Sequence, residues 1–198
     1  FMVAASIVPD SDLILRDVGL NPTRTGVIQI LELMGANISL SNEHLVGGEP
    51  VADIRIQYAP LVGIDIPERL VPLAIDEFPV LFIAAACATG TTVLTGAEEL
   101  RVKESDRIQA MVDGLVALGI QAKGTPDGAI IKGGCLGAGH EQVDVQSHDD
   151  HRIAMAFTVA SLRSSSKIVI HECDNVATSF PNFASLARSV GFQLIVEA

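Results

Sequence analysis

The sequence LRVKESDRIQAMVDGLVALG, residues 100–119, joins a dense group of charges to the pattern of a helix. Five ionisable side chains fall within residues 100–107, although only 19% of this 198-residue chain is charged. Apolar residues then recur at helical spacing, and Ser105 is of a type that often caps a helix N-terminus. Gly119 predicts the helix end, because glycine readily adopts the left-handed conformation found there. We therefore expect a helix that begins at a charged entrance.

The same order of elements recurs along the chain. A polar helix start, a helix, a glycine and a strand are also predicted over residues 25–40 and 179–196. Together with intervening apolar helices, they predict a repeated strand-helix-strand-strand-helix unit with copies at about 13–88 and 92–162 and an incomplete copy at 168–198. Residues 1–8 are typical of the end of a preceding helix. The expected fold is α/β, with residues 1–198 forming a single domain.

Composition excludes several classes of partner. The net charge of -11 and the pI near 4.7 argue against nucleic acid and anionic membranes, which both select basic surfaces. The longest apolar stretch, residues 78–88, is too short for a membrane span and contains Pro79. Cys87, Cys135 and Cys173 show neither disulfide nor zinc-site spacing, which favours a reducing, cytoplasmic location.

A second charged entrance, His148-Asp149-Asp150-His151-Arg152, precedes another apolar helical pattern. Asp149 or Asp150 is suited to cap this helix, which leaves His151 and Arg152 in its first turn. Positive groups there oppose the helix dipole, so a bound anion would relieve an unfavourable arrangement. The two histidines and two acids lack a distant third partner for a metal, and we predict no metal site.

The two entrances together predict a site for one anionic ligand. Lys103, Glu104 and Arg107 would cluster at the first helix, where backbone N–H groups already favour an anion. The alternative is a solvated first turn in which Arg107 pairs with an acidic neighbour and no ligand binds. An arginine at such a position suits a phosphate or a carboxylate.

Two further helix entrances carry candidate residues. Asp76 precedes the apolar helix at 78–88, and its place in the repeat puts it near Asp150. It is suited either to act as a general base or to cap the helix, and the pattern favours neither. Arg24, in the turn before the first helix, is a fourth candidate anion contact or part of a structural turn.

Residues 100–107 closely match the signature of the 5-enolpyruvylshikimate-3-phosphate synthase family, and residues 149–155 match its second landmark. The resemblance covers the whole chain, and residues 21–26, 75–77 and 177–181 are similar to the glyphosate-insensitive bacterial subgroup. It implies an enolpyruvyl transferase-like fold of repeated units with helices packed inside. Family members have two such domains, and this chain is similar to the C-terminal part, which forms most of one.

The resemblance implies transfer of the enolpyruvyl group of phosphoenolpyruvate to the 5-hydroxyl of shikimate 3-phosphate, a step of the shikimate pathway. It implies no metal or organic cofactor, and glyphosate as a weak inhibitor. Asp76 would bind shikimate 3-phosphate and abstract a proton, Lys103 would bind the same substrate, and Glu104 would transfer a proton. Substrate contacts to phosphoenolpyruvate are implied for Arg107 and Arg152, with the neighbouring His151 as a further candidate.

One position departs from the better-known enterobacterial and plant subgroup. Thr178 stands where that subgroup has a lysine, so this phosphoenolpyruvate contact is not carried over. The other domain of the cleft is also missing, and we expect the chain to be inactive alone. Two alternatives remain: a noncatalytic anion-binding half-domain, and a UDP-N-acetylglucosamine enolpyruvyl transferase, whose signatures lack the Lys-Glu-Ser-Asp-Arg run.

Overall fold

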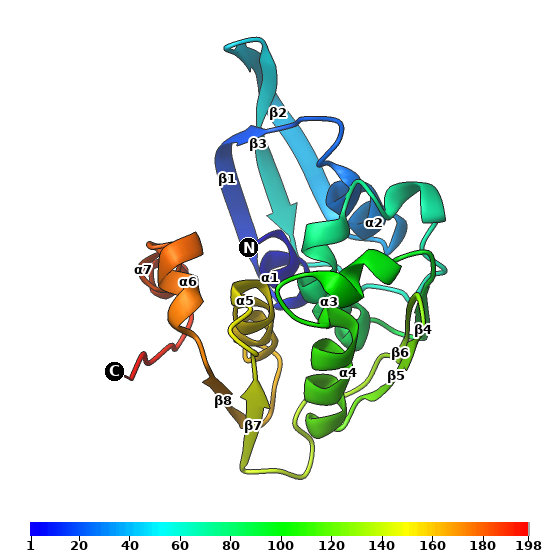
Figure 1. The fold of residues 1–198 in the computed structure, drawn as a ribbon. Helices are drawn as coiled ribbons and strands as arrows, with labels where there is room; N and C mark the ends of the chain where they lie inside the picture. The colour runs from blue at the N-terminus through cyan, green and yellow to red at the C-terminus, as the bar shows by residue number, and fades with distance from the viewer. Residues whose placement is uncertain (198) are drawn as a thin grey trace.

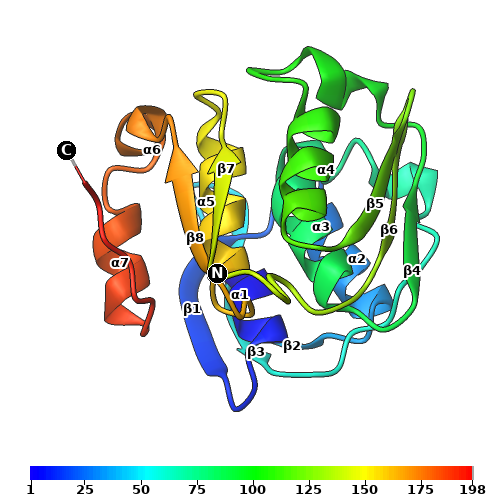
Figure 2. The same ribbon diagram turned by 90° about the horizontal axis from the view of Figure 1, so that it is seen from below.

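The computed structural model describes residues 1–197 and shows three small sheets around a group of buried helices (Figure 1). The view from below shows the strands at the periphery and helices α1, α3, α4 and α5 between them (Figure 2). The bounds of these helices are Met2–Ile7, Phe78–Cys87, Arg107–Ala117 and His151–Ala160. The expectation of an α/β fold with helices packed inside is therefore confirmed.

The first sheet contains three antiparallel strands in the order β1-β3-β2. Their bounds are Asp12–Gly19 for β1, Asn37–Val46 for β2 and Glu49–Gln57 for β3, with α2 at Gly26–Leu33 between the first two. Register shifts interrupt β1 between Leu15 and Val18 and β2 between Ser41 and His44, so both outer strands bulge beside the central one. The β2–β3 hairpin projects beyond the rest of the molecule (Figure 1).

The second sheet has the order β4-β6-β5 and is also antiparallel. Strand β4 is Thr91–Leu94, β5 is Gln121–Thr125 and β6 is Gly128–Lys132. Helix α4 joins β4 to β5 through the 3-10 helix η3 at Glu98–Val102. The segment before α3 contains two further 3-10 turns, η1 at Glu68–Leu70 and η2 at Ile75–Glu77. Both sheets thus arise from the same order of strand, helix, strand and strand.

Helix α3 forms the centre of the hydrophobic core. Phe78 and Ile83 are fully buried, and the helix packs against α1, α4 and α5. A helix with apolar residues on every side can be stable only when it is enclosed in this way. Its position explains why the polar residues before it, at η2, lie at the mouth of a buried helix.

The structure corrects three details of the predicted repeat. Strand β7, Gln142–Gln146, was not expected. It pairs in parallel with β8, Lys167–His171, and α5 forms the connection between the two strands. The third copy continues with α6, Asp174–Ser179, and α7, Phe183–Ser189, but its predicted second strand is wrong, because no strand follows Gly191 as far as residue 197. No neighbouring strand among the described residues offers this segment the pairing that a strand requires.

The third correction concerns the start of α4. Ser105 is not the N-cap: the helix begins at Arg107, and the side chain of Asp106 accepts a hydrogen bond from the Gln109 N–H at 2.9 Å. Both residues are suitable capping types, and the structure uses the second because the first contacts another helix entrance. No helix within residues 1–197 is long and apolar enough to cross a membrane.

Candidate functional site

Four cationic side chains from three parts of the chain surround the carboxylate of Asp76. Asp76 Oδ2 lies 3.3 Å from Arg152 Nη2 and 3.5 Å from Arg24 Nη2. Asp76 Oδ1 lies 3.5 Å from Arg107 Nη1 and 3.8 Å from Lys103 Nζ. Arg152 Nη1 also donates to the backbone oxygen of Asp76 at 2.9 Å. The structure therefore brings these predicted residues together, and we call them the Asp76 cluster.

The Arg107 guanidinium is the buried member of the Asp76 cluster, with 1% of its side chain exposed. Its Nε donates to Asp150 Oδ2 at 2.8 Å, and its Nη2 donates to Glu104 Oε2 at 2.5 Å. Nη2 also lies 3.5 Å from Asp150 Oδ1. Arg107 thus connects Glu104, Asp76 and Asp150, three carboxylates at three helix entrances.

Asp150 is fully buried and caps α5, where its Oδ1 accepts from the Arg152 N–H at 2.9 Å. The Ser105 hydroxyl donates to its Oδ2 at 3.0 Å. Burial acts to raise the pKa of the Asp150 carboxyl, but the hydrogen bond and charge of Arg107, the Arg152 N–H and the Ser105 hydroxyl outweigh it and hold the pKa below its ordinary value. Asp150 therefore remains an ionised partner of Arg107 at neutral pH.

Two local arrangements position the cations. Arg101, although part of the charged run, is structural: it pairs with the capping residue Asp106 at 2.7 Å, and its Nε donates to the Pro126 backbone oxygen at 2.8 Å. At the other entrance, Asn21 Oδ1 accepts from the Thr23 N–H at 3.0 Å, a turn that sets the backbone ahead of Arg24 and α2. Loop geometry therefore decides which charges reach the cluster.

Two residues considered from the sequence lie outside this network. The ring of His151 makes no hydrogen bond or ion pair with another residue in the range 1–197, although its neighbours on both sides belong to the site. Thr178 is exposed on α6 and likewise contributes no contact to the Asp76 cluster. The described residues contain no group of three or more His, Cys, Asp or Glu side chains arranged to hold a metal ion.

The sequence did not assign a site role to Asp150, and it left Arg24 open between an anion contact and a structural turn. Asp150 was expected to lie near Asp76 and was one of two possible caps for α5, because adjacent aspartates give no signal that tells a buried one from an exposed one. Arg24 was recognised as a candidate, but a turn also explained it. Its pairs with Asp76 and with Glu77 Oε1, at 3.1 Å, place it beside the cluster.

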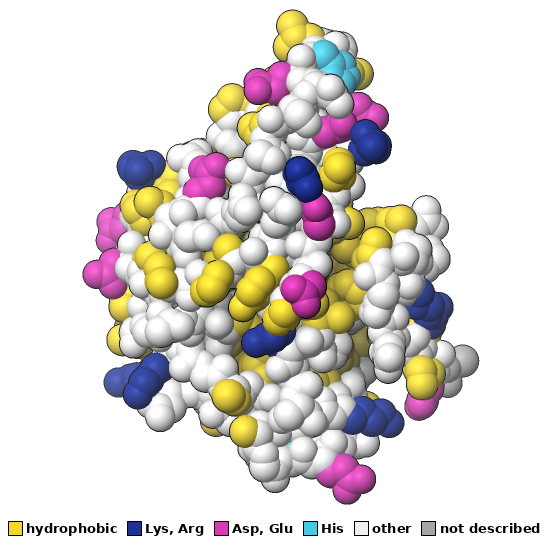
Figure 3. Space-filling model, turned by 180° about the vertical axis from the view of Figure 1, so that it is seen from behind, with side chains coloured by type: hydrophobic (Ala, Val, Ile, Leu, Met, Phe, Trp, Pro, Cys, Tyr) yellow, Lys and Arg dark blue, Asp and Glu magenta, His cyan; other side chains and the backbone are white. Residues whose placement is uncertain are grey.

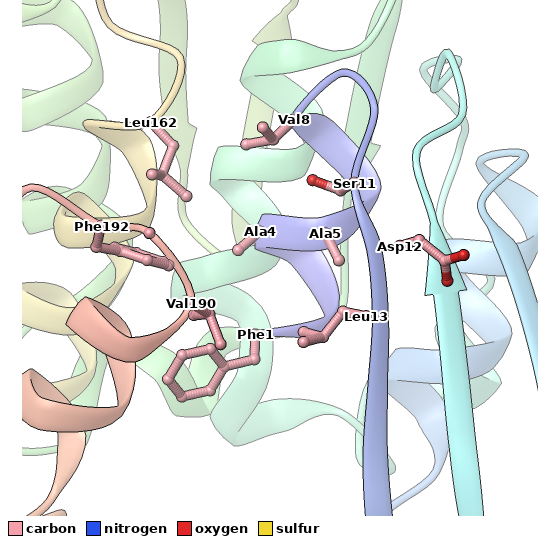
Figure 4. Close-up of a pocket in the computed structure, with 11 residues that line it drawn as sticks. Phe1, Ala4, Ala5, Val8, Ser11, Asp12, Leu13, Leu162, Val190 and Phe192 are labelled. Atoms are coloured by element: carbon pink, nitrogen blue, oxygen red, sulfur yellow. The ribbon is translucent and has the colours of Figure 1, made fainter.

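A separate apolar cavity of about 380 Å³ lies between α1, the start of β1 and residues 190–192 (Figure 4). Phe1 and Phe192 both line it, with ring centroids 6.1 Å apart, and Leu162 completes the lining from the segment after α5. Seen from behind, hydrophobic side chains line the hollow between the body of the molecule and the C-terminal helices (Figure 3). No residue of the Asp76 cluster lines this cavity.

The geometry suits a reaction of anionic substrates. Four cations at helix entrances can neutralise phosphate or carboxylate groups, while Asp76 and Glu104 supply carboxylates that can move protons. The fold is that of the enolpyruvyl transferases: the structure of the enolpyruvyl transferase NikO from Streptomyces tendae matches 96% of this chain with a TM-score of 0.71, at 17% identity. That likeness establishes the fold class alone.

The family follows from closer matches. Residues 1–186 match the profile described as EPSP synthase (3-phosphoshikimate 1-carboxyvinyltransferase), and the chain belongs to this family. A Methylococcus capsulatus 3-phosphoshikimate 1-carboxyvinyltransferase is 64% identical over 99% of this chain and 44% of its own length. The corresponding Legionella pneumophila protein is 58% identical over 98% of this chain and 44% of its own length.

A solved relative agrees with these sequences. The structure of EPSP synthase from Acinetobacter baumannii matches the whole chain with a TM-score of 0.94 and 54% identity, over 45% of its own chain. The family predicted from residues 100–107 is therefore confirmed. The chain spans less than half the length of the relatives that it matches.

Proposed function

We propose that this chain forms one wall of an active site that transfers the enolpyruvyl group of phosphoenolpyruvate to the 5-hydroxyl of shikimate 3-phosphate, with release of phosphate. The observation that carries the proposal is the Asp76 carboxylate with four cations within 3.8 Å. Two polyanionic substrates must be held side by side, and such a set of charges offsets their repulsion. The family membership supports the choice of these two substrates.

The roles of individual residues are part of this proposal. Asp76 and Lys103 bind shikimate 3-phosphate, and Asp76 accepts the proton of the attacking hydroxyl. Arg107 and Arg152 bind phosphoenolpyruvate, with His151 beside them. Glu104 transfers a proton at the enolpyruvyl methylene; its side chain is 55% exposed and touches Arg107, so it can reach a ligand held by that arginine.

The second wall of the cleft would come from the remainder of a family member. In this proposal residues 1–198 form most of one of two domains, and the chain alone is inactive. The relatives support this view, since each is more than twice as long as the matched region. The three cysteines, none of them in a disulfide, support a cytoplasmic location for the enzyme.

A chimera tests the proposed activity. The matching 44% of the Methylococcus capsulatus relative is replaced by this chain, and phosphate release from the two substrates is measured. We expect turnover, and we expect Arg107→Ala to lower kcat/KM roughly 100- to 1,000-fold, the usual cost of removing one preorganised charge-stabilising donor. Arg69→Ala is the matched control, because Arg69 is exposed and makes no hydrogen bond or ion pair within residues 1–197. A folded chimera without turnover would contradict the proposal.

A binding experiment separates the proposal from a noncatalytic anion-binding domain. Calorimetry with millimolar shikimate 3-phosphate should show heat of binding to the chain that Lys103→Ala abolishes, whereas the control Arg69→Ala leaves it unchanged. Binding that Lys103→Ala does not alter would place the ligand elsewhere. Binding to the chain combined with an inactive, folded chimera would favour the noncatalytic anion-binding half-domain. Turnover of UDP-N-acetylglucosamine by the chimera would favour a UDP-N-acetylglucosamine enolpyruvyl transferase.

The subgroup is also a proposal. Residues 21–26, which include Arg24, and residues 75–77 and 177–181 support the glyphosate-insensitive bacterial subgroup. Glyphosate would then bind weakly in place of phosphoenolpyruvate. The inhibition constant of glyphosate for the chimera should lie well above the KM for phosphoenolpyruvate, and an inhibition constant below that KM would contradict the assignment.

A further inference from the structure

We propose that Asp150 is a positioning residue for the phosphoenolpyruvate site: it fixes the guanidinium of Arg107 and the start of the helix that carries Arg152. This inference rests on the proposed function, and it concerns a residue that touches no substrate. Asp150 joins the entrances of two helices that lie far apart in the sequence, and it is fully buried between them.

Asp150 uses both carboxylate oxygens for this purpose. Oδ2 accepts from Arg107 Nε at 2.8 Å and from the Ser105 hydroxyl at 3.0 Å, which ties down the segment before α4. Oδ1 accepts from the Arg152 N–H at 2.9 Å, which ties down the first turn of α5. One carboxylate therefore sets the separation of the two arginines proposed to hold the same ligand.

These contacts hold the Arg107 guanidinium most firmly at its Nε side and leave Nη1 with the weakest partner. Nε is committed to Asp150, and Nη2 is shared between Asp150 and Glu104. Nη1 has a single contact within residues 1–197, at 3.5 Å to Asp76 Oδ1. A guanidinium held at its Nε side presents its remaining donors in a fixed plane, which is what bidentate recognition of a carboxylate or phosphate needs.

A strained turn brings Asp150 into this position. His148 and Asp149 have φ angles of 55° and 56°, in the left-handed region that non-glycine residues rarely occupy. The Asp150 N–H donates to the Ser147 backbone oxygen at 3.0 Å and closes the turn. Such backbone strain persists only where the surrounding structure holds it, and it concentrates at functional sites.

The segment after β8 holds the turn in place. Asn175 Nδ2 donates to the Asp149 backbone oxygen at 2.6 Å, and the buried Ser147 hydroxyl donates to the Glu172 backbone oxygen at 2.6 Å. The Ser147 N–H also reaches the His171 backbone oxygen at 3.3 Å. The third copy of the repeat therefore supports the site through Asp150, without placing a charge in it.

The experiment uses the chimera with Asp150→Asn, and with Asp113→Asn as a control of equal charge on the exposed side of α4. We expect Asp150→Asn to lower kcat/KM for phosphoenolpyruvate roughly 10- to 100-fold, as loss of a supporting contact does, chiefly through a higher KM for that substrate. The KM for shikimate 3-phosphate should change far less. An equal rise in both KM values, or an effect no larger than that of the control, would overturn the inference.

A second measurement covers the case in which Asp150→Asn does not fold. Ser105→Ala removes one hydrogen bond to Asp150 and should shift the same KM in the same direction by a few-fold. Hydrogen exchange of the Arg107 Nε–H, followed by NMR in the chain itself, should be slow in the unsubstituted protein and faster in Ser105→Ala. An exchange rate that is the same in Ser105→Ala and in the unsubstituted chain would overturn the positioning role. This result does not depend on turnover. An inactive unsubstituted chimera would overturn the proposed function instead.

Discussion

Two buried aspartates have nearly the same kinds of hydrogen-bond partner, but the arginines that they bind differ in exposure. Asp53, on β3, accepts from Arg16 Nη1 at 3.2 Å, from the Asp17 N–H at 3.0 Å and from Asn42 Nδ2 at 2.7 Å. Asp150 also accepts from one arginine, one backbone N–H and one neutral polar side chain. The partner arginines differ: the Arg16 side chain is 69% exposed, and that of Arg107 is 1% exposed.

This difference in arginine exposure distinguishes the Asp53 cluster, which is structural, from the Asp150 cluster, which belongs to the proposed site. Asp53 lies opposite both bulges of the first sheet, where Asp17 and Asn42 have φ angles of 52°, and its interactions end at the protein surface. The Arg107 guanidinium instead continues to Asp76 and Glu104. A buried arginine with more than one carboxylate partner therefore marks the site better than a buried aspartate does.

The largest expected effect on stability comes from replacing the two partner arginines, Arg107 and Arg16. Arg107→Met should lower the free energy of unfolding by about 3–5 kcal/mol, because it leaves Asp150 buried without its partner. Arg16→Met should cause a much smaller loss, since its exposed guanidinium is well solvated. Urea unfolding of both variants measures this, with Arg69→Met as the control for loss of an unpaired surface arginine. Equal losses for the first two variants would remove the distinction.

A smaller effect is expected at the left-handed residues beside each aspartate. Asp149→Gly should raise the free energy of unfolding by up to about 1 kcal/mol, because glycine adopts positive φ without strain and the Asp149 side chain makes no hydrogen bond within residues 1–197. Asn42→Gly should lower it, because it removes the 2.7 Å bond to Asp53. Thermal unfolding compares the two, and a gain for both would show that the Asn42 bond contributes nothing.

The smallest effect concerns pH. The pKa values of both carboxyls are lowered, at Asp53 chiefly by hydrogen bonds from Asn42 and the Asp17 N–H. A carboxyl with a lowered folded pKa stabilises the protein above its unfolded pKa, near 4, and loses that contribution as pH falls toward the folded value. Unfolding measured between pH 7 and pH 3 should therefore show falling stability on the acid side. Asp150→Asn should flatten this slope, and an unchanged slope would contradict the assigned role of Asp150.

Left-handed residues were predictable where glycine marks them, but not where another residue type adopts this conformation. Gly35 and Gly119 follow α2 and α4 with φ angles of 92° and 81°, as expected from the sequence. His148 and Asp149 adopt the same region without any such signal, because tertiary hydrogen bonds rather than residue type hold them there. Strand β7 was missed for a similar reason: its partner β8 belongs to the next copy of the repeat.

The candidate site was predictable as a set of residues but not as a network. The spacing of residues 100–107 indicated charges at a helix start, yet gave no reason to separate Arg101, which holds the loop, from Arg107, which is buried. Ser105 and Asp106 are equally good caps by type. Their different roles arise because Asp150, from a distant segment, accepts the Ser105 hydroxyl.

The parallel pairing of β7 and β8 has a consequence for the order of folding. The hairpins β2–β3 and β5–β6 join neighbouring segments, whereas Gln142 meets Lys167 only after the chain has closed a loop that includes all of α5. Asp150 lies within that loop, and its contact with Arg107 spans 43 residues. The anion site thus depends on contacts between distant segments, so we expect a nascent protein to form its hairpins before it can bind a ligand.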